Sequence, residues 1–326
     1  MVSSIDVAKL AGVSQATVSR VLNNSEKVYA PTVEKVNAAI QQLNYRPNAA
    51  ARSLVSRKSG IIALMCGPLD DPENAEFAGK TIAYAQEKGF IAELHIQDPK
   101  EPSTVFGTIS KSQAEGIIAG PLVLVGTGVE MLETSGIPYV FCGTEHDGEG
   151  SFVSMDNHAA GRMAADYICG LNHRLVGWVG GSHGERRLRD RYTGFLERMQ
   201  EQETQILSAT NAIPDLDAVL SAMMARKDRP TAIVAGTDAI GAEAIDFLIA
   251  YGYSIPEDIT VVGIGNSKQS AMNYLSLSSI GLSGETDIFE AAMDLLTAQM
   301  DDDSVNTVPN DRILPQLFQR KSSCAV

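Results

Sequence analysis

Residues 6–23 read DVAKLAGVSQATVSRVLN, and this stretch decides the fold of the N-terminal part of the chain. The spacing of its apolar residues predicts a short helix over residues 5–10, with Ser4 as the N-cap. Gly12 follows and suits the left-handed backbone of a tight turn. Ser14 is predicted to cap a second helix that runs to about Asn23, and a third helix is predicted over residues 32–44.

A helix, a short turn and a second helix form the helix-turn-helix motif, whose second helix enters the major groove of DNA. The outward face of that helix is predicted to carry short polar side chains and an arginine, which suit base edges and phosphate. The candidate DNA-binding residues here are Ser14, Gln15, Ala16, Thr17, Ser19, Arg20 and Asn23. The alternative is a three-helix bundle that only packs against the rest of the chain.

The charge of the chain is unevenly distributed. The 326 residues carry 26 basic and 40 acidic side chains, for a net charge of −14. Residues 1–58 hold eight basic and three acidic side chains, a net of +5, whereas the remainder holds 18 and 37, a net of −19. A phosphate backbone attracts the first part and repels the second. The N-terminal segment is therefore the part that we expect to bind nucleic acid.

The 6–23 stretch resembles the N-terminal signature of the lactose/galactose repressor (LacI/GalR) family of bacterial transcription regulators. Residues 43–54, LNYRPNAAARSL, resemble the hinge of that family. The resemblance implies that the hinge helices of two subunits pair in the minor groove, where Leu54 wedges between base pairs. Asn48 and Arg52 complete the candidate DNA contacts of the hinge. The alternative is a plain linker, with Leu54 packed on the core.

One position departs from the family pattern. Tyr29 stands where the family usually has a serine that caps the third helix, and tyrosine cannot act as an N-cap. Two outcomes remain open: Thr32 caps a shorter third helix, or the start of that helix is less stable.

From residue 61 onward, short apolar runs alternate with helical stretches. Predicted strands include residues 61–65, 176–179, 232–235 and 260–264, and predicted helices include 77–88, 158–171, 187–200 and 239–251. This alternation predicts an α/β fold with parallel sheets covered on both faces. The resemblance implies a periplasmic-binding-protein-like body with two lobes and a ligand cleft between them.

Together these features predict an all-α helix-turn-helix headpiece joined to a two-lobed α/β effector domain. We expect a DNA-binding domain over residues 1–46 and a hinge helix with linker over 47–60. An effector-binding and dimerisation domain follows over 61–326. Within it, lobe one is expected over about 61–156 and 285–315, and lobe two over about 157–284 and 316–326.

Ligands of parallel α/β sheets lie beyond the carboxyl ends of the strands, so residues just after the strands are cleft candidates. Asp70, Asp71 and Glu73 follow the first predicted strand, and Asp238 and Asn266 follow later ones. Arg191 precedes Gly194-Phe195 by three residues, where the resemblance implies an effector-binding arginine. The candidate ligand-binding residues are Asp70, Phe77, Arg191, Asp238 and Asn266.

Each of these residues also has a purely structural interpretation. Residues 186–191 fit a solvated helix face that carries four arginines, and Asp238 fits a helix cap. Trp178 fits the core better than a stacking platform, because it lies within an apolar strand. An aspartate often stands in the family where this chain has Gly265, so either Asn266 substitutes for it or the effector differs.

The sequence contains little that indicates an enzyme. Residues 180–184, GGSHG, match the nucleophile elbow of α/β-hydrolases, but no histidine follows His183 to complete a triad. There is no phosphate-binding loop or dinucleotide fingerprint, and no His or Cys pair has metal-ligand spacing. We therefore predict no catalytic residue, no metal and no cofactor.

Four isolated cysteines, and the absence of a signal peptide or an apolar run of membrane length, favour a cytoplasmic protein. We predict a homodimeric transcriptional repressor that binds double-stranded operator DNA under the control of a small-molecule effector, such as a sugar or sugar derivative. The rival hypothesis is a cytoplasmic sugar-binding protein, or an enzyme acting on the same ligand, with a vestigial DNA-binding head.

Overall fold

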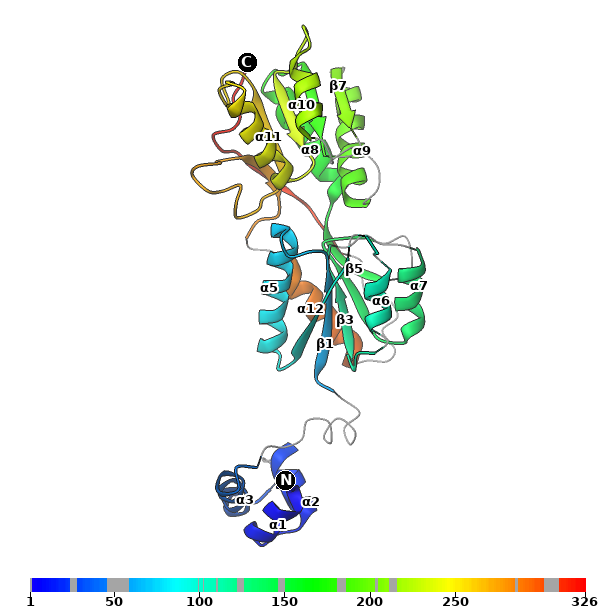
Figure 1. Cartoon of the computed structure of the whole chain (residues 1–326), viewed down its shortest axis with the longest axis vertical. Helices are drawn as coiled ribbons and strands as arrows, with labels where there is room; N and C mark the ends of the chain where they lie inside the picture. The colour runs from blue at the N-terminus through cyan, green and yellow to red at the C-terminus, as the bar shows by residue number, and fades with distance from the viewer. Residues whose placement is uncertain are drawn as a thin grey trace. The chain divides into compact units, whose positions relative to one another are not determined.

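The structure, a computed structural model, describes residues 2–23, 28–45, 59–98, 100–101, 103–109, 111–121, 126–145, 150–180, 186–202, 205–210, 216–284, 287–301 and 311–326. The chain divides into two compact units, Met1–Gly60 and Ile61–Val326. We call the first unit the head and the second the body, and Figure 1 shows the helices and strands of each.

The head contains the predicted helix-turn-helix, formed by α1 (Ser4–Ala11) and α2 (Gln15–Asn23). The cap of α1 is Ser3 rather than Ser4: the Ser3 hydroxyl accepts from the Asp6 amide while the Asp6 carboxylate accepts from the Ser3 amide. This reciprocal capping box satisfies two amides that a lone Ser4 cap would not. Gly12 ends α1 with φ of 68°, and the Ser14 hydroxyl caps α2 by accepting from the Thr17 amide at 3.1 Å.

The third helix, α3 (Ala30–Gln42), begins two residues earlier than predicted. Tyr29 occupies its N-cap position without a side-chain hydrogen bond, so Thr32 lies inside the helix and does not cap a shorter one. Pro31 in the first turn fits this start, because its fixed φ suits a helix and it has no amide to satisfy there. Val7, Val18 and Val36, one from each helix, are fully buried and form the centre of the head.

The body contains two six-stranded sheets. The first has the order β11-β5-β4-β3-β1-β2, and all its strand pairs are parallel. Its strands are β1 (Ile61–Cys66), β2 (Ile91–Ile96), β3 (Gly116–Ala119), β4 (Tyr139–Cys142), β5 (Ser151–Met155) and β11 (Asp311–Ile313).

The second sheet has the order β12-β10-β9-β8-β6-β7 and is parallel except for the edge pair of β10 and β12. Its strands are β6 (Leu175–Val179), β7 (Gln205–Thr210), β8 (Ala232–Ala235), β9 (Thr260–Gly265), β10 (Ser278–Gly281) and β12 (Gln316–Phe318).

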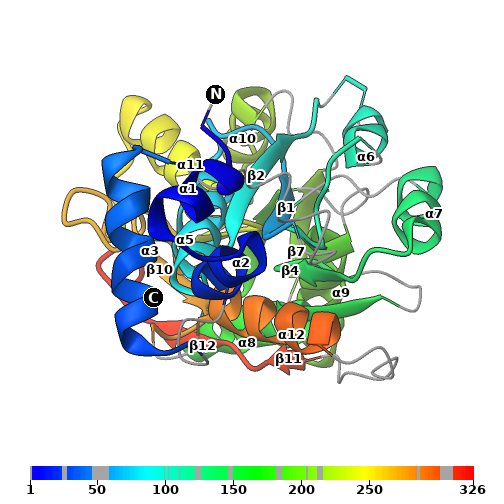
Figure 2. The ribbon, with the colours of Figure 1, turned by 90° about the horizontal axis from the view of Figure 1, so that it is seen from below.

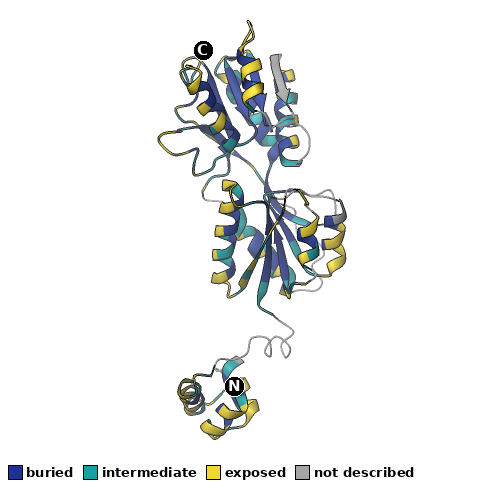
Figure 3. Ribbon diagram, viewed as in Figure 1, coloured by how far each residue is buried: buried dark blue, intermediate teal, exposed yellow. Residues whose placement is uncertain are grey.

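Helices cover both faces of each sheet, and the sheets form the buried centres of the two lobes (Figures 1 and 3). In lobe one, α5 (Pro72–Glu87) and α12 (Ile288–Asp301) pack on one face, and α6 (Thr104–Ile109) and α7 (Gly126–Ser135) pack on the other (Figure 2). In lobe two, α8 (Asn157–Gly170) and α9 (Arg186–Glu201) cover one face, and α10 (Leu216–Met224) and α11 (Asp238–Ala250) cover the other.

The chain passes between the lobes at three places. These are residues 155–157 between β5 and α8, residues 281–288 between β10 and α12, and residues 313–316 between β11 and β12. The two lobes are therefore not consecutive in sequence, and their facing surfaces come from distant segments. Trp178 is fully buried in the core of lobe two, with ring centroids 5.5 Å from Tyr192 and 5.0 Å from Phe195, which confirms the core prediction.

Candidate functional site

The outer face of α2 is exposed as the helix-turn-helix prediction requires. Gln15, Ala16, Ser19 and Arg20 are exposed, and Thr17 is half-buried. The Gln15 side-chain amide donates to the Ser4 hydroxyl at 3.0 Å, which connects the start of α2 to the start of α1. This hydrogen bond fixes the direction of the Gln15 side chain.

Other candidates for DNA contact are described only in part or not at all. Asn23 is the last residue of α2, and its side chain is not among the described ones. The hinge candidates Asn48, Arg52 and Leu54 lie outside the described residues.

A cleft of about 320 Å³ in the body is lined by both lobes. Lobe one contributes the starts of α5 and α12 and the end of β4, while lobe two contributes α9, the start of α8 and the loop after β9. Its lining comprises Glu73, Glu76, Lys80, Pro121, Cys142, Gly143, Met155, Asn157, Arg187, Arg191, Gly265, Asn266, Ser267, Lys268, Leu282, Ser283, Gly284, Asp287, Ile288 and Phe289. Carboxylates, cations and apolar side chains thus border one space.

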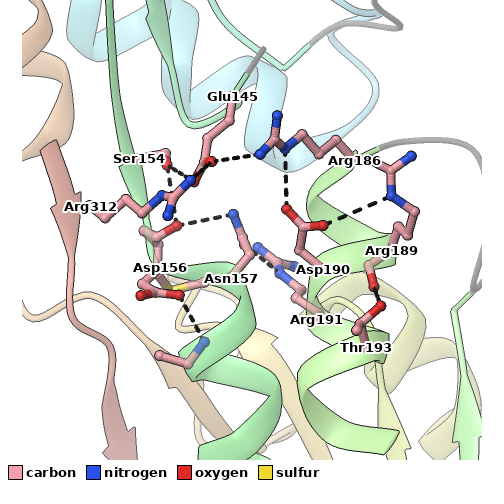
Figure 4. A network of polar contacts seen from close by, with 12 residues as sticks. Glu145, Ser154, Asp156, Asn157, Arg186, Arg189, Asp190, Arg191, Thr193 and Arg312 are labelled. Atoms are coloured by element: carbon pink, nitrogen blue, oxygen red, sulfur yellow. Dashed lines mark hydrogen bonds and ion pairs between the residues drawn. The ribbon is translucent and has the colours of Figure 1, made fainter. Parts of the chain in front are cut away.

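Arg191 lies on α9 and is 4% exposed. Its Nε donates to the Asn157 side-chain oxygen at 2.9 Å (Figure 4). Its Nη1 donates to the Gly236 carbonyl at 2.7 Å. A buried guanidinium needs such acceptors, because burying a charge without partners is expensive. These bonds fix the side chain at the cleft wall, so Arg191 does not belong to a solvated helix face.

Arg187 lies one helical turn before Arg191, and its guanidinium forms an ion pair with Glu73 of the opposite lobe. The Arg187 side chain is 11% exposed. Burial by itself raises the pKa of the Glu73 carboxyl, but the guanidinium groups of Arg187 and Arg191 outweigh burial and hold this pKa below its ordinary value. Glu73 is therefore a carboxylate at neutral pH and an acceptor for hydrogen bonds in the cleft.

The loop after β9 forms the floor of the cleft on lobe two. Gly265 has φ of 143° and Asn266 has φ of 52°. The Asn266 amide donates to the Ser279 hydroxyl at 2.9 Å, and its side-chain amide donates to the Leu282 carbonyl at 2.9 Å. The Arg320 guanidinium donates to the Asn266 side-chain oxygen at 2.5 Å. These contacts hold Asn266 in a conformation that few residues other than glycine adopt.

Asp238 lies directly behind this loop. Its carboxylate accepts from the Ser267 amide and from the Ser279 hydroxyl, each at 2.6 Å. Thr237, not Asp238, caps α11, because its hydroxyl accepts from the Ile240 amide at 3.2 Å. Asp238 is 4% exposed and is not among the lining residues, so it supports the cleft from the next layer.

The opposite wall carries a polar cluster at the start of α12. Asp287 accepts from Lys80 at 3.1 Å and from the Tyr84 hydroxyl at 2.9 Å, and Lys80 lies 5.0 Å from the centroid of the Phe289 ring. The hydrogen bond to Asp287 raises the pKa of Tyr84 to about 12. Tyr84 therefore acts as a hydrogen-bond donor at neutral pH.

Of the five ligand-binding candidates, Arg191 and Asn266 line the cleft and Asp238 lies behind it. Phe77 is fully buried in the core of lobe one, and Asp70 is exposed, and neither is among the lining residues. Sequence reasoning missed Lys80, Asp287 and Lys268, and treated Arg187 as one member of an arginine row. Asp287 lies just beyond the predicted lobe boundary at about residue 285, and a charged residue so close to that boundary was the available signal.

The structure offers no metal cluster among its described residues, since no group of three or more His, Cys, Asp or Glu side chains there is arranged to hold an ion. No helix in the described part of the chain is long and apolar enough to cross a membrane. Of the elbow-like GGSHG stretch, Gly180 is described, with φ of 130°, and residues 181–184 lie outside the described residues.

Comparisons with known proteins bear on both units. The family model described as bacterial regulatory proteins, lacI family, matches residues 5–48. The model for a periplasmic binding protein-like domain matches residues 165–323. The chain is 30% identical over 275 residues to the HTH-type transcriptional regulator CelR of Thermobifida fusca, a match that covers 80% of this chain and 81% of that protein.

Solved structures share the fold. The lac repressor dimer bound to operator and the anti-inducer ONPF has a TM-score of 0.84 and 22% identity, with 99% of each chain covered. A complex of the transcriptional regulator CelR with cellobiose has a TM-score of 0.70 and 24% identity, with 99% of this chain and 100% of that chain covered.

Proposed function

The chain belongs to the lacI family of bacterial regulatory proteins, and we propose that it is a homodimeric repressor whose affinity for operator DNA is set by a small sugar-like effector in the cleft of its body. We further propose the domain boundaries 1–46, 47–60 and 61–326 for the DNA-binding domain, the hinge and the effector domain. A repressor acts at the chromosome, so we place it in the cytoplasm, and we assign it no enzymatic activity.

The observation that carries this proposal is the exposed polar face of α2 in a helix-turn-helix. Ala16 and Ser19 are short enough to let the helix backbone approach base edges, Gln15 offers an amide to those edges, and Arg20 reaches phosphate or guanine. The N-terminal 58 residues carry a net charge of +5, which favours duplex DNA, while the net −19 of the remainder disfavours non-specific contacts by the body.

The chemistry of the cleft favours a sugar. Glu73, Arg191 and Asn266 present acceptors and donors for hydroxyl groups, and the Phe289 ring presents an apolar surface to a face of C–H bonds. A volume of about 320 Å³ is of the size that small ligands fill. The solved complex of CelR with cellobiose supports the same class of effector for this chain.

Binding and DNA affinity are linked through the arrangement of the two lobes. An effector that binds one arrangement more tightly changes the spacing of the two hinges in the dimer, and by that route the affinity for operator. Two heads related by a twofold axis require a near-palindromic operator with half-sites about one helical turn apart.

The test is operator binding by full-length wild type and by Arg20→Ala and Leu54→Ala variants, on DNA selected from a random pool. Each change is expected to weaken specific binding by about 1–3 kcal/mol. Arg226→Ala, which removes an exposed arginine of the body, is the control and should leave binding unchanged. If the wild-type protein in moderate salt prefers no sequence over random competitor, the proposal fails.

A second measurement identifies the effector. Because a ligand that binds only the native state raises the melting temperature, a thermal-shift screen of sugars, sugar phosphates and nucleosides should yield a stabilising compound. An Arg191→Gln variant should lose that shift.

A further inference from the structure

Glu145 is a buried carboxylate outside the cleft, and its partners come from three separate segments. Its side chain is 5% exposed. It accepts from the Ser154 hydroxyl at 2.9 Å and from the Arg312 guanidinium at 2.9 Å, and it forms an ion pair with Arg186 at 3.4 Å (Figure 4). The two guanidinium groups compensate the charge of this buried carboxylate, which would be expensive to bury without ionic partners.

Two of these partners lie where the chain leaves lobe one. Ser154 on β5 and Arg312 on β11 face each other in register. Each stands one residue before the end of its strand, and each strand leads directly into lobe two. The Asp156 amide donates to the Ile313 carbonyl at 2.9 Å, so the two crossings are also joined to each other. Glu145 is thus bonded to the residue that immediately precedes each of two adjacent crossings.

The third partner belongs to the other lobe. Arg186 is the first residue of α9, and its Nε donates to Asp190 one turn further along at 3.3 Å. The same first turn carries Arg187, which pairs with Glu73 across the cleft, and the next turn carries Arg191. The N-terminal end of α9 therefore contacts lobe one both beside the crossings and in the cleft.

We propose that Glu145 is a positioning residue for the effector site, which holds the first turn of α9 against the lobe crossings and so keeps the cleft closed. This inference rests on the proposed role of the cleft. When the lobes separate, the Glu145–Arg186 contact breaks, whereas the Ser154 and Arg312 contacts stay within lobe one. Lobe opening then moves Arg187 and Arg191 together with Arg186, because all three lie on one rigid helix.

Two native cysteines of lobe one report on this movement. Both belong to the same hydrophobic core of lobe one. Cys142 is 1% exposed and also lines the cleft, whereas Cys66 is fully buried and is not among the lining residues. Burial raises the pKa of both thiols, so both react slowly with maleimide while the structure is closed. Opening of the cleft exposes Cys142, whereas loosening of the lobe itself exposes both.

The experiment measures N-ethylmaleimide labelling of each cysteine by peptide mass spectrometry, on full-length protein without effector or DNA. Arg186→Gln should raise the Cys142 rate roughly tenfold, the shift in open population that corresponds to about 1.4 kcal/mol, and leave the Cys66 rate unchanged. Arg186→Lys, which keeps the charge, should stay close to wild type. Arg189→Gln is the matched control on the same helix, since Arg189 is 47% exposed and pairs with Asp190 at 3.9 Å.

Two outcomes overturn the proposal: an unchanged Cys142 rate in Arg186→Gln, or a parallel rise of the Cys142 and Cys66 rates. In the double variant Glu145→Gln, Arg186→Gln, Cys142 should be labelled no faster than in the faster of the two single variants, because both changes break the same contact. The assay contains neither DNA nor effector. A failure of operator binding would therefore overturn the proposed function and leave the labelling result intact.

Discussion

Gly161 on α8 lies against the backbone carbonyl of Arg191 on α9, with no room for a side chain between them. A Cβ on Gly161 would lie 1.9 Å from that oxygen, and a Cβ on Gly194 would lie 2.1 Å from the His158 carbonyl oxygen. Both obstacles are backbone atoms, which cannot rotate away. The two glycines set how closely α8 and α9 approach, and thereby where Arg191 enters the cleft.

The first prediction concerns this contact. Gly194→Ala should lower the free energy of unfolding by about 3 kcal/mol, since the two helices must move apart to admit a methyl group. Urea unfolding of wild type and variant measures the change. Gly170→Ala, at the end of α8 with no atom within 4 Å of the added carbon, is the control and should shift stability by less than about 1 kcal/mol. Equal unfolding curves for Gly194→Ala and wild type would contradict the prediction.

The second prediction concerns the support behind the cleft loop. In Asp238→Asn, one of the two donors that face the carboxylate, the Ser267 amide or the Ser279 hydroxyl, meets an NH2 group instead of an oxygen. The unfolding free energy should fall by about 1–3 kcal/mol, the penalty for a buried polar group without a partner. Asp246→Asn on the exposed side of α11 provides the control. If both variants unfold alike, Asp238 does not support the loop as described.

The third prediction concerns base recognition by α2. Exchanging the residues at 15 and 16, as Gln15→Ala with Ala16→Gln, should change the preferred operator sequence, because base contacts set specificity and phosphate contacts do not. Selection from a random DNA pool measures the preferred sequence of each protein. Gln42→Ala, which removes an exposed glutamine from α3, should leave the preference as it is. An unchanged consensus in the exchanged protein would remove these positions from the recognition surface.

The fourth prediction concerns pH and the C-terminal tail. His173 is 2% exposed, with Nε2 3.0 Å from the Cys324 carbonyl and Nδ1 2.8 Å from the Thr231 hydroxyl. Because a carbonyl only accepts, Nε2 carries the proton and Nδ1 accepts from Thr231. Burial lowers the pKa of His173, an effect that the bond to the Cys324 carbonyl only partly offsets.

A lowered pKa in the folded state means that the unfolded chain binds the proton more readily. The contribution of His173 to stability is therefore complete above its ordinary pKa near 6.5 and declines as the pH falls below that value. His173→Gln should unfold with a shallower dependence on pH between about 7.5 and 5 than wild type. Denaturant midpoints across that range test this, and parallel curves would refute it.

The helix-turn-helix was predictable because its determinants are local. The Ser14 cap, the turn at Gly12 and the buried Val18 all act within a few residues of one another, and each is confirmed. The predicted Ser4 cap was wrong by one residue, because the capping box with Asp6 favours Ser3. The prediction of the α3 start was also wrong, since Tyr29 replaces the serine cap expected there and Pro31 favours a helix that begins at Ala30.

The body was predictable as a class of fold, while the composition of its cleft was not. Alternating strands and helices specify parallel sheets, because each strand needs apolar residues on both faces and each helix needs one apolar stripe. Which charges meet across the cleft depends on three chain crossings. These bring Glu73 of lobe one to Arg187 of lobe two, 114 residues away. Within lobe one, they also bring Arg312 to Glu145, 167 residues away.

The amino-acid sequence by itself determined the three-helix head, the parallel α/β body and the separation of positive from negative charge, since these follow from spacing and composition. The division of the body into two lobes was implied by the family resemblance. Only the tertiary structure decided that Phe77 is core, that Asp238 supports the loop that carries Asn266, and that Arg191 is a fixed wall of the cleft. The reason is physical: a side chain's role in a site depends on which distant backbone comes within hydrogen-bonding reach, and nothing in its neighbours along the chain specifies that.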